Sequence, residues 1–246
     1  MLHKINFLIK NESSFLIIYL FILQKFKNFL IKRKVLKQKR VNQLNLKNYK
    51  ISYDWFSSHA YYFKHFMNKL PENFKYLEIG SFEGNSAIFV SSNFPKSEIT
   101  CVDPWINYEE NSRADLKDVE KIFDQNIKNL INIIKKKDTS NNFFIKNNQK
   151  YNFIYIDGYH KYEYVLKDCL NSWEALLPGG ILVCDDYIWE FYKGSELKLN
   201  PCFAINKFLE IKKKHIKVLL VTNSQIFIKK LTNQADNFLK QVDNFV

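Results

Sequence analysis

The sequence contains few of the residues that break or cross-link a chain. Its 246 residues include six glycines, five prolines and four cysteines. The cysteines have no C-x-x-C pair among them, and we interpret them as small buried hydrophobes of a protein in the reducing cytoplasm. No internal repeat or Pro-rich linker follows residue 50, so a single folded domain is expected over residues 51–232, with a short tail at 233–246.

Long hydrophobic runs are also absent. The longest, Phe15–Leu23, has nine residues, well short of the ~20 that a membrane-spanning helix needs. The next segment, Gln24–Arg40, mixes Lys and Arg with apolar residues and predicts a basic amphipathic helix that could lie on a membrane surface. The alternative for residues 1–50 is a poorly ordered leader.

Acidic residues are scarce at one end of the chain. Residues 1–50 contain twelve Lys or Arg and one acid, Glu12, whereas the rest contains 25 basic and 24 acidic residues. The overall charge of +12 therefore belongs almost entirely to the N-terminal segment. A nucleic-acid-binding surface needs basic residues on the folded body, so this distribution argues against a nucleic-acid partner.

After Ser52, short apolar strands alternate with helix-length segments. Strands are expected at Tyr76–Ile79, Ile99–Val102, Asn132–Lys135, Phe153–Ile156 and Ile181–Cys184. Helices are expected at Asp54–Leu70, Asn85–Ser92, Ala114–Leu130, Ser140–Ile145, Tyr162–Leu177 and Pro201–Lys214. Strands that are apolar throughout are typical of a parallel sheet with helices on both faces. Two last strands, Ile216–Thr222 and Gln225–Leu231, are joined so tightly that they must pair antiparallel.

A glycine-bounded turn follows the first of these strands. Glu78 and Gly80 end the strand, and Gly84 precedes the next helix, an arrangement that lets a ligand approach backbone N–H groups. The dinucleotide pattern G-x-G-x-x-G is absent, and Glu78 would repel a pyrophosphate but suit a cationic ligand. Asp103, at the end of the second strand, could accept both hydroxyls of a ribose; its alternative role is to cap a loop.

Further acidic residues follow the fourth and fifth strands. If these strands are neighbours, Asp157, Asp185 and Asp186 converge, and such charges repel unless a cation or protons compensate. Oxygen ligands of this kind suit Mg²⁺, and His160 lies within loop reach as a candidate base. The alternative is that one or two of the carboxylates only cap helices and no metal binds.

Taken together, five segments resemble the macrocin O-methyltransferase-like group of class I S-adenosylmethionine-dependent methyltransferases, which is distantly similar to catechol O-methyltransferase. These segments are LEIGSFEGNSA, ITCVDPW, FIYIDGYHKYEYVLKDCL, LLPGGILVCDDY and AINKF, and the resemblance covers Tyr53–Leu231. It implies an α/β, Rossmann-like fold with a mostly parallel seven-stranded sheet, a C-terminal antiparallel hairpin and helices on both faces.

The resemblance also implies roles for the motif residues. Glu78, Gly80 and Gly84 would line the methionine end of the cofactor, together with the residues of the same turn, Ser81, Asn85 and Ser86. Asp103 would hold the ribose; Asp157, Asp185 and Asp186 would bind the metal, and His160 would be the base, with Asp157 beside it in the catalytic site. The stretch Lys137-Asp138-Thr139 departs from relatives, so the adenine contact stays unassigned.

The function expected from these residues is O-methylation of a hydroxyl on a sugar or other small molecule, with S-adenosylmethionine as donor and Mg²⁺ as activator. The alternatives are a membrane-associated scaffold that keeps the fold without activity, and a metal-dependent glycosyltransferase that uses Asp185 and Asp186. The expected location is the cytoplasm, with contact to a membrane surface through residues 1–50 as a further option. The acceptor and the oligomeric state are left open, because substrate choice depends on variable loops.

Overall fold

A computed structural model of the chain describes residues 1–37, 48–106 and 118–232. The predicted tail at 233–246 and the start of the predicted helix Ala114–Leu130 lie outside the described residues.

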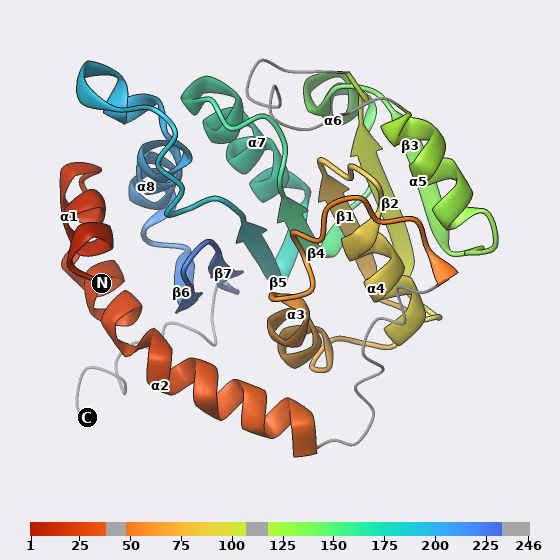
Figure 1. Cartoon of the computed structure of the whole chain (residues 1–246), viewed down its shortest axis with the longest axis horizontal. Helices are drawn as coiled ribbons and strands as arrows, with labels where there is room; N and C mark the ends of the chain where they lie inside the picture. The colour runs from red at the N-terminus through yellow and green to blue at the C-terminus, as the bar shows by residue number, and fades with distance from the viewer. Residues whose placement is uncertain (38–47, 107–117, 233–246) are drawn as a thin grey trace.

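One sheet of seven strands forms the centre of the molecule, in the order β3-β2-β1-β4-β5-β7-β6 (Figure 1). The strands are β1 Lys75–Ile79, β2 Glu98–Asp103, β3 Ile133–Lys137, β4 Tyr151–Ile156, β5 Leu176–Cys184, β6 Ile216–Val221 and β7 Ile226–Lys230. The first five are parallel, and β7 pairs antiparallel with both β5 and β6. The predicted Rossmann-like sheet with a C-terminal antiparallel hairpin is confirmed.

Helices cover both faces of this sheet. In chain order they are α1 Leu2–Lys10, α2 Phe15–Lys37, α3 Ala60–Met67, α4 Asn85–Asn93, α5 Val119–Ile127, α6 Ser140–Lys146, α7 Tyr162–Ala175, the 3₁₀ helix η3 Gly194–Leu199 and α8 Pro201–Lys212. Alternate residues of each strand enter opposite cores, as a pleated strand requires. Leu77 and Ile154 pack with α7 and α8, whereas Tyr76 and Phe153 pack with α3 and α4.

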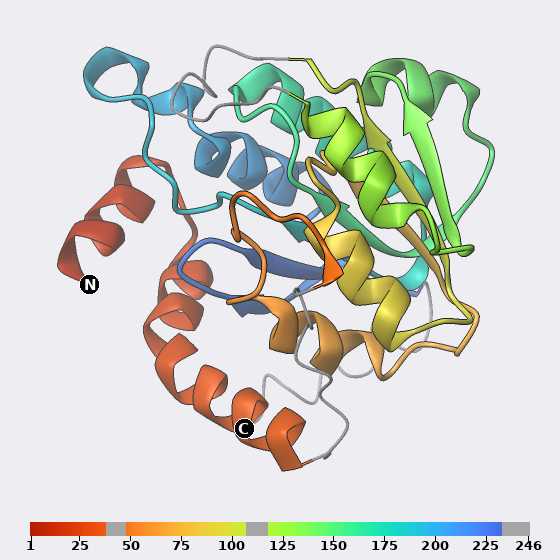
Figure 2. The same cartoon turned by 45° about the vertical axis from the view of Figure 1, so that its right-hand side comes forward.

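The first two helices lie against the hairpin edge of the sheet. Figures 1 and 2 show α1 and α2 along one side of the molecule, and α2 contacts both β6 and α3. Five side chains of the two helices join the core around α7 and α8: Phe7, Leu8, Ile17, Leu20 and Phe21. The pair therefore covers an edge strand that would otherwise expose unpaired backbone groups.

Most predicted elements are shifted at their ends by a few residues, and three differ more clearly. The helix predicted at Asp54–Leu70 is only α3, because the Asp54 carboxylate accepts a hydrogen bond from the Ser57 backbone and holds a turn there. The strand predicted at Ile181–Cys184 begins five residues earlier, at Leu176, where the turn after α7 joins the sheet. The helix predicted at Gln24–Arg40 starts at Phe15 and includes the apolar run.

Within the residues described, no helix is both long and apolar enough to cross a membrane.

Candidate active site

A large cavity lies at the carboxyl ends of the central strands. Strand order reverses between β1 and β4, and ligands of open α/β sheets bind beside such a reversal. Gly80, Asp103, Asp157 and Asp185, which end or follow four adjacent strands, all line this cavity of about 1050 Å³. The sheet topology therefore brings together residues that are far apart in the sequence.

The glycine-bounded turn after β1 packs against the loop after β4. Gly80 has a φ of +84°, and a Cβ placed on it would lie 1.9 Å from the backbone carbonyl oxygen of Asp157. Gly84, with a φ of +85°, precedes α4, and its Cβ would press on the ring of Phe123. Gly80 also lines the cavity. Glycine is needed at this position mainly because the turn after β1 and the loop after β4 approach each other too closely for a side chain.

Asp103 holds the same turn in place. Its Oδ2 accepts hydrogen bonds from the backbone N–H groups of Ser81 (2.8 Å) and Phe82 (3.0 Å), and its Oδ1 accepts one from Trp105 (2.6 Å). Burial raises the pKa of Asp103, and these three donors oppose the rise. The side chain thus fulfils the loop-capping role and still faces the cavity.

Glu78 is fully buried behind the cavity wall. Its Oε2 accepts a hydrogen bond of 2.5 Å from the hydroxyl of Tyr76, whereas its Oε1 is buried with no hydrogen-bond partner. Burial raises the pKa of Glu78 to about 7, which the Tyr76 hydroxyl opposes. The contribution of Glu78 to a bound cation would therefore be electrostatic and would act through the turn.

Three polar residues of the turn and α4 do line the cavity: Ser81, Asn85 and Ser86. The Asn85 amide donates a hydrogen bond to the Asp54 carboxylate (2.9 Å), while the Asn85 Oδ1 and the Ser81 hydroxyl are buried without a partner. Buried polar atoms without partners are costly, and a ligand in the cavity could satisfy them.

The carboxylates after β4 and β5 meet at a tyrosine. The Tyr155 hydroxyl lies within hydrogen-bond distance of Asp157 Oδ2 (2.9 Å) and of Asp185 Oδ2. The amide of Gln225 and the backbone N–H of Asp186 also donate to Asp185. Burial and the neighbouring Asp157 carboxylate raise the pKa of Asp185. The acidic groups therefore converge as predicted. The Tyr155 hydroxyl has one proton and can donate it to only one carboxylate at a time, Asp157 or Asp185.

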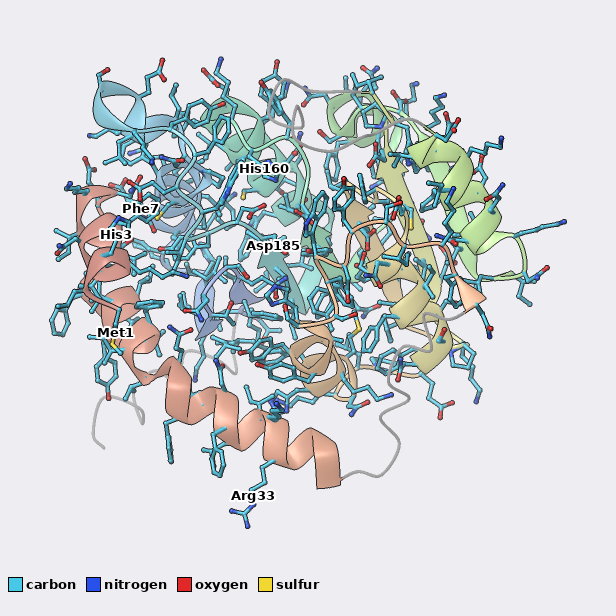
Figure 3. The ribbon with its side chains drawn as sticks, viewed as in Figure 1. Met1, His3, Phe7, Arg33, His160 and Asp185 are labelled. Carbon is cyan, nitrogen blue, oxygen red and sulfur yellow. The ribbon has the colours of Figure 1, made fainter. Side chains whose placement is uncertain are left out.

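The described side chains that could hold a metal ion include two of the three predicted aspartates. Asp157, His160 and Asp186 can place one ligand atom each within 4.8 Å of one another, whereas the Asp185 oxygens accept the hydrogen bonds just described. The Nε2 atom of His160 lies 2.9 Å from Asp186 Oδ2 and 3.9 Å from Asp157 Oδ1. Trp189 packs edge-on against the same imidazole. In Figure 3, His160 and Asp185 are labelled near the middle of the molecule.

Aromatic side chains form a rim that the sequence analysis did not single out. Tyr53 stacks on Trp55, and Trp55 packs against Phe82, with ring centroids 5.2 and 4.9 Å apart. The indole N–H of Trp105 donates to the backbone carbonyl of Phe82 at 2.9 Å. All four residues line the cavity. The aromatic density of residues 53–62 is a signal that could have identified part of this wall.

Further polar lining residues come from elements outside the motifs. His59, before α3, has its Nε2 3.2 Å from the Ser224 hydroxyl in the β6–β7 turn, and its Nδ1 is buried without a partner. Asp168 of α7 is buried with its Oδ1 unpaired, and burial raises the pKa of this carboxyl to about 7. Asp168 lies in the segment FIYIDGYHKYEYVLKDCL, but its spacing gave it no role, and His59 belongs to none of the quoted segments. Only the fold brings these two side chains to one cavity.

Comparison with protein families gives a match within the region that contains this site. Residues 77–187 match a family described as a methyltransferase domain. Over this segment, which is a little under half of the chain, the sequence is similar to methyltransferase domains. A comparison with curated proteins found no significant match.

Solved structures share the fold of the methyltransferase domain at low sequence identity. A protein from Klebsiella pneumoniae described as an O-methyltransferase has a TM-score of 0.56 at 12% identity, covering 85% of this chain and 97% of its own. An rRNA methylase from Clostridium thermocellum has a TM-score of 0.51 at 15% identity, covering 68% and 94%. MycE, of the mycinamycin biosynthetic pathway, has a TM-score of 0.53 at 17% identity, covering 77% of this chain.

The MycE match spans only 52% of the MycE chain, so the present chain corresponds to about half of that protein. The MycE structure contains Mg, S-adenosylhomocysteine and mycinamycin VI. The neighbours are described as different kinds of methylase, so the shared fold does not decide the acceptor.

Proposed function

We propose that the protein transfers a methyl group from S-adenosylmethionine to a hydroxyl of a small molecule, with a divalent cation, Mg²⁺, assisting. The observation that carries the proposal is one cavity with two chemically different ends. Ser81 and Asp103 lie at the end formed by β1 and β2, and Asp157, His160 and Asp186 lie at the end formed by β4 and β5.

The first end fits the cofactor. The Asp103 carboxylate faces the cavity beside the glycine turn, and the Ser81 hydroxyl and Asn85 Oδ1 are buried without hydrogen-bond partners that a ligand could supply. The buried Glu78 supplies negative potential behind the turn, which suits a sulfonium cation. S-adenosylmethionine would supply an activated methyl group. The cavity volume leaves space for an acceptor beside it, since small-molecule pockets commonly occupy about 300–1,000 Å³.

The second end fits a hard divalent cation. Carboxylate oxygens of Asp157 and Asp186 are suitable ligands, and water could complete the set. Asp185 lies next to Asp186 and could act as a further ligand or orient the site through Tyr155 and Gln225. A bound Mg²⁺ would lower the cost of negative charge on a hydroxyl oxygen.

His160 is the proposed general base, with Asp157 and Asp186 beside it. A hydroxyl attacks poorly while it holds its proton, so a base must accept that proton as the C–O bond forms. The Asp186 carboxylate, 2.9 Å from the imidazole, orients the ring and stabilises its protonated form. Trp189 limits rotation of the ring from the other side.

The proposed acceptor is a sugar hydroxyl or another small-molecule hydroxyl. The aromatic rim of Tyr53, Trp55 and Phe82 offers flat apolar surfaces that can pack against a ring. The sugar-bearing macrolide bound by MycE supports this choice as a structural analogy. The near-neutral charge of residues 51–246 supports a partner other than nucleic acid.

The proposed location is the cytoplasm. All four cysteines are buried and fit the expected role of small core side chains. A reducing compartment keeps such thiols unpaired.

Titration calorimetry of the full chain tests the proposal without knowledge of the acceptor. S-adenosylhomocysteine should bind, and NAD should not. Mn²⁺, as a probe for Mg²⁺, should bind to the wild type and to Asp124→Asn, whose substitution lies in α5 away from the cluster, but more than tenfold more weakly to Asp186→Asn. If the chain binds neither S-adenosylhomocysteine nor NAD, the scaffold alternative is favoured. Equal Mn²⁺ affinity of the wild type, Asp124→Asn and Asp186→Asn would exclude the proposed metal site.

A further inference from the structure

Helix α2 is apolar on two opposite faces. The inner face, with Ile17, Leu20 and Phe21, is buried against the methyltransferase domain. The opposite face exposes five large apolar residues spaced alternately four and three apart, referred to below as the outer stripe: Phe15, Tyr19, Ile22, Phe26 and Phe29. These five are between 46% and 85% exposed.

A continuous row of this kind is unusual on a folded surface. Spacings of four and three keep successive side chains on one side of a helix, so the row extends about 21 Å along α2 at 1.5 Å per residue. Single exposed apolar residues need no explanation, but contiguous apolar patches mark sites of interaction. The outer stripe is therefore a surface for a partner.

The charges of α2 restrict what that partner can be. The helix contains Lys25, Lys27, Lys32, Arg33, Lys34 and Lys37 and no acidic residue. Arg33 continues the spacing of the outer stripe, and Figure 3 shows its side chain pointing away from the body of the molecule. A row of exposed aromatic residues with cations on the same helix is the pattern of an interfacial helix at an anionic lipid surface.

A second copy of this chain fits the same surface poorly. Two α2 helices packed through their outer stripes would bring their cations together, with no acidic residue on either helix to pair across the contact. Helices that associate in this way normally use opposite charges beside the apolar seam. Because α2 contains no acidic residue, an anionic membrane fits the outer stripe better than a second copy of the chain does.

We propose that α2 binds an anionic membrane surface through the outer stripe and its flanking cations. The contact differs from the amphipathic helix expected at Gln24–Arg40, because it begins at Phe15 and uses the face opposite the packed one. It concerns a surface separate from the methyl-transfer site and does not depend on that chemistry.

Docking of this kind would hold the cavity close to the lipid. The side chains of Lys4 and Gln24 bond to Asn223 in the β6–β7 turn, at 3.1 and 3.4 Å. The next residue, Ser224, lines the cavity. The helix that binds lipid is therefore fixed to one wall of the site.

The test is co-sedimentation of the full chain with two kinds of vesicle, phosphatidylcholine alone and phosphatidylcholine mixed with phosphatidylglycerol. Strong binding to the anionic vesicles only, weakened by salt, is expected. The double variant Phe26→Ser/Phe29→Ser should lose at least tenfold in affinity. Its control is Ile131→Ser/Ile145→Ser, which removes two apolar residues elsewhere that are even more exposed and should bind as wild type.

A second variant, Lys32→Glu/Arg33→Glu, should also lose binding to the anionic vesicles. It tests the proposal independently if Phe26→Ser/Phe29→Ser fails to fold. Sedimentation velocity and S-adenosylhomocysteine titration of every variant separate the other outcomes. Absence of vesicle binding, or a dimer that the stripe variant converts to monomer without any vesicle binding, would overturn the proposal. Either result would leave cofactor binding, and hence the proposed methyl transfer, unaffected.

Discussion

Asp168 of α7 is a buried acid in the wall of the cavity whose hydrogen bonding is incomplete. Its carboxyl is buried with one oxygen unpaired, and burial raises its pKa from 3.8 to about 7. The folded protein therefore retains this proton at a pH where the unfolded chain has already released it. The contribution of Asp168 to stability must fall as the pH rises from about 4 to about 7.

Replacement of Asp168 by Asn removes this ionisation. The free energy of unfolding of Asp168→Asn, relative to wild type, should increase across that pH window by up to about 4 kcal/mol, since one pKa unit corresponds to about 1.4 kcal/mol. Urea denaturation of both proteins at several pH values measures the difference. A difference that does not change between pH 4 and pH 8 would contradict the assigned burial cost.

His160 is the proposed general base of the methyl transfer. Removal of a general base typically slows a reaction by about 10²–10⁴. We expect His160→Ala to lose activity in that range with an identified acceptor, while its affinity for S-adenosylhomocysteine stays within about twofold, a difference of only ~0.4 kcal/mol. His215→Ala, an exposed histidine before β6, is the matched control. Full turnover by His160→Ala would exclude it as the base.

At the scale of elements, the β1 turn and the β4 loop form one unit. The sequence predicts a ligand-approaching turn at Gly80, and the fold adds the reason that glycine is required: the Asp157 backbone occupies the space of a side chain. That contact was beyond prediction because it depends on the pairing of β1 with β4. The pairing of β4 with β5 explains why the acidic groups converge as predicted. Tyr155 and Gln225, which hold them, could not be identified from spacing.

Two glycines with the same backbone conformation test this requirement. Gly80 and Gly179 have φ values of +84° and +79°, but a Cβ on Gly179 would meet nothing within 4 Å. Gly179→Ala should cost about 1–2 kcal/mol from backbone strain alone. Gly80→Ala should cost several kcal/mol, roughly 3 or more, because a clash is added. Thermal and urea denaturation compare the two, and equal costs would show that the loops separate easily.

At the scale of the whole molecule, residues 1–37 are the part that the sequence describes least well. An apolar run such as Phe15–Leu23 has no periodicity, so it does not reveal which side packs. The sequence therefore leaves two alternatives for this segment, an amphipathic helix and a poorly ordered leader. In the structure the two helices share a core with α7 and α8 and bond to the hairpin turn through Lys4 and Gln24.

Two phenylalanines of α2 can decide whether this helix contributes to the stability of the domain. Phe21 is 2% exposed in the core with α7 and α8, whereas Phe26 is 65% exposed in the outer stripe. Phe21→Ala should lower the free energy of unfolding by about 3–5 kcal/mol, because it leaves a cavity in the core. Phe26→Ala should change it by less than about 0.5 kcal/mol. Urea denaturation followed at the tryptophans, all four of which lie after residue 50, reads out the domain itself. If both variants unfold at the wild-type midpoint, α2 is an independent appendage, and a membrane could then bind either of its faces.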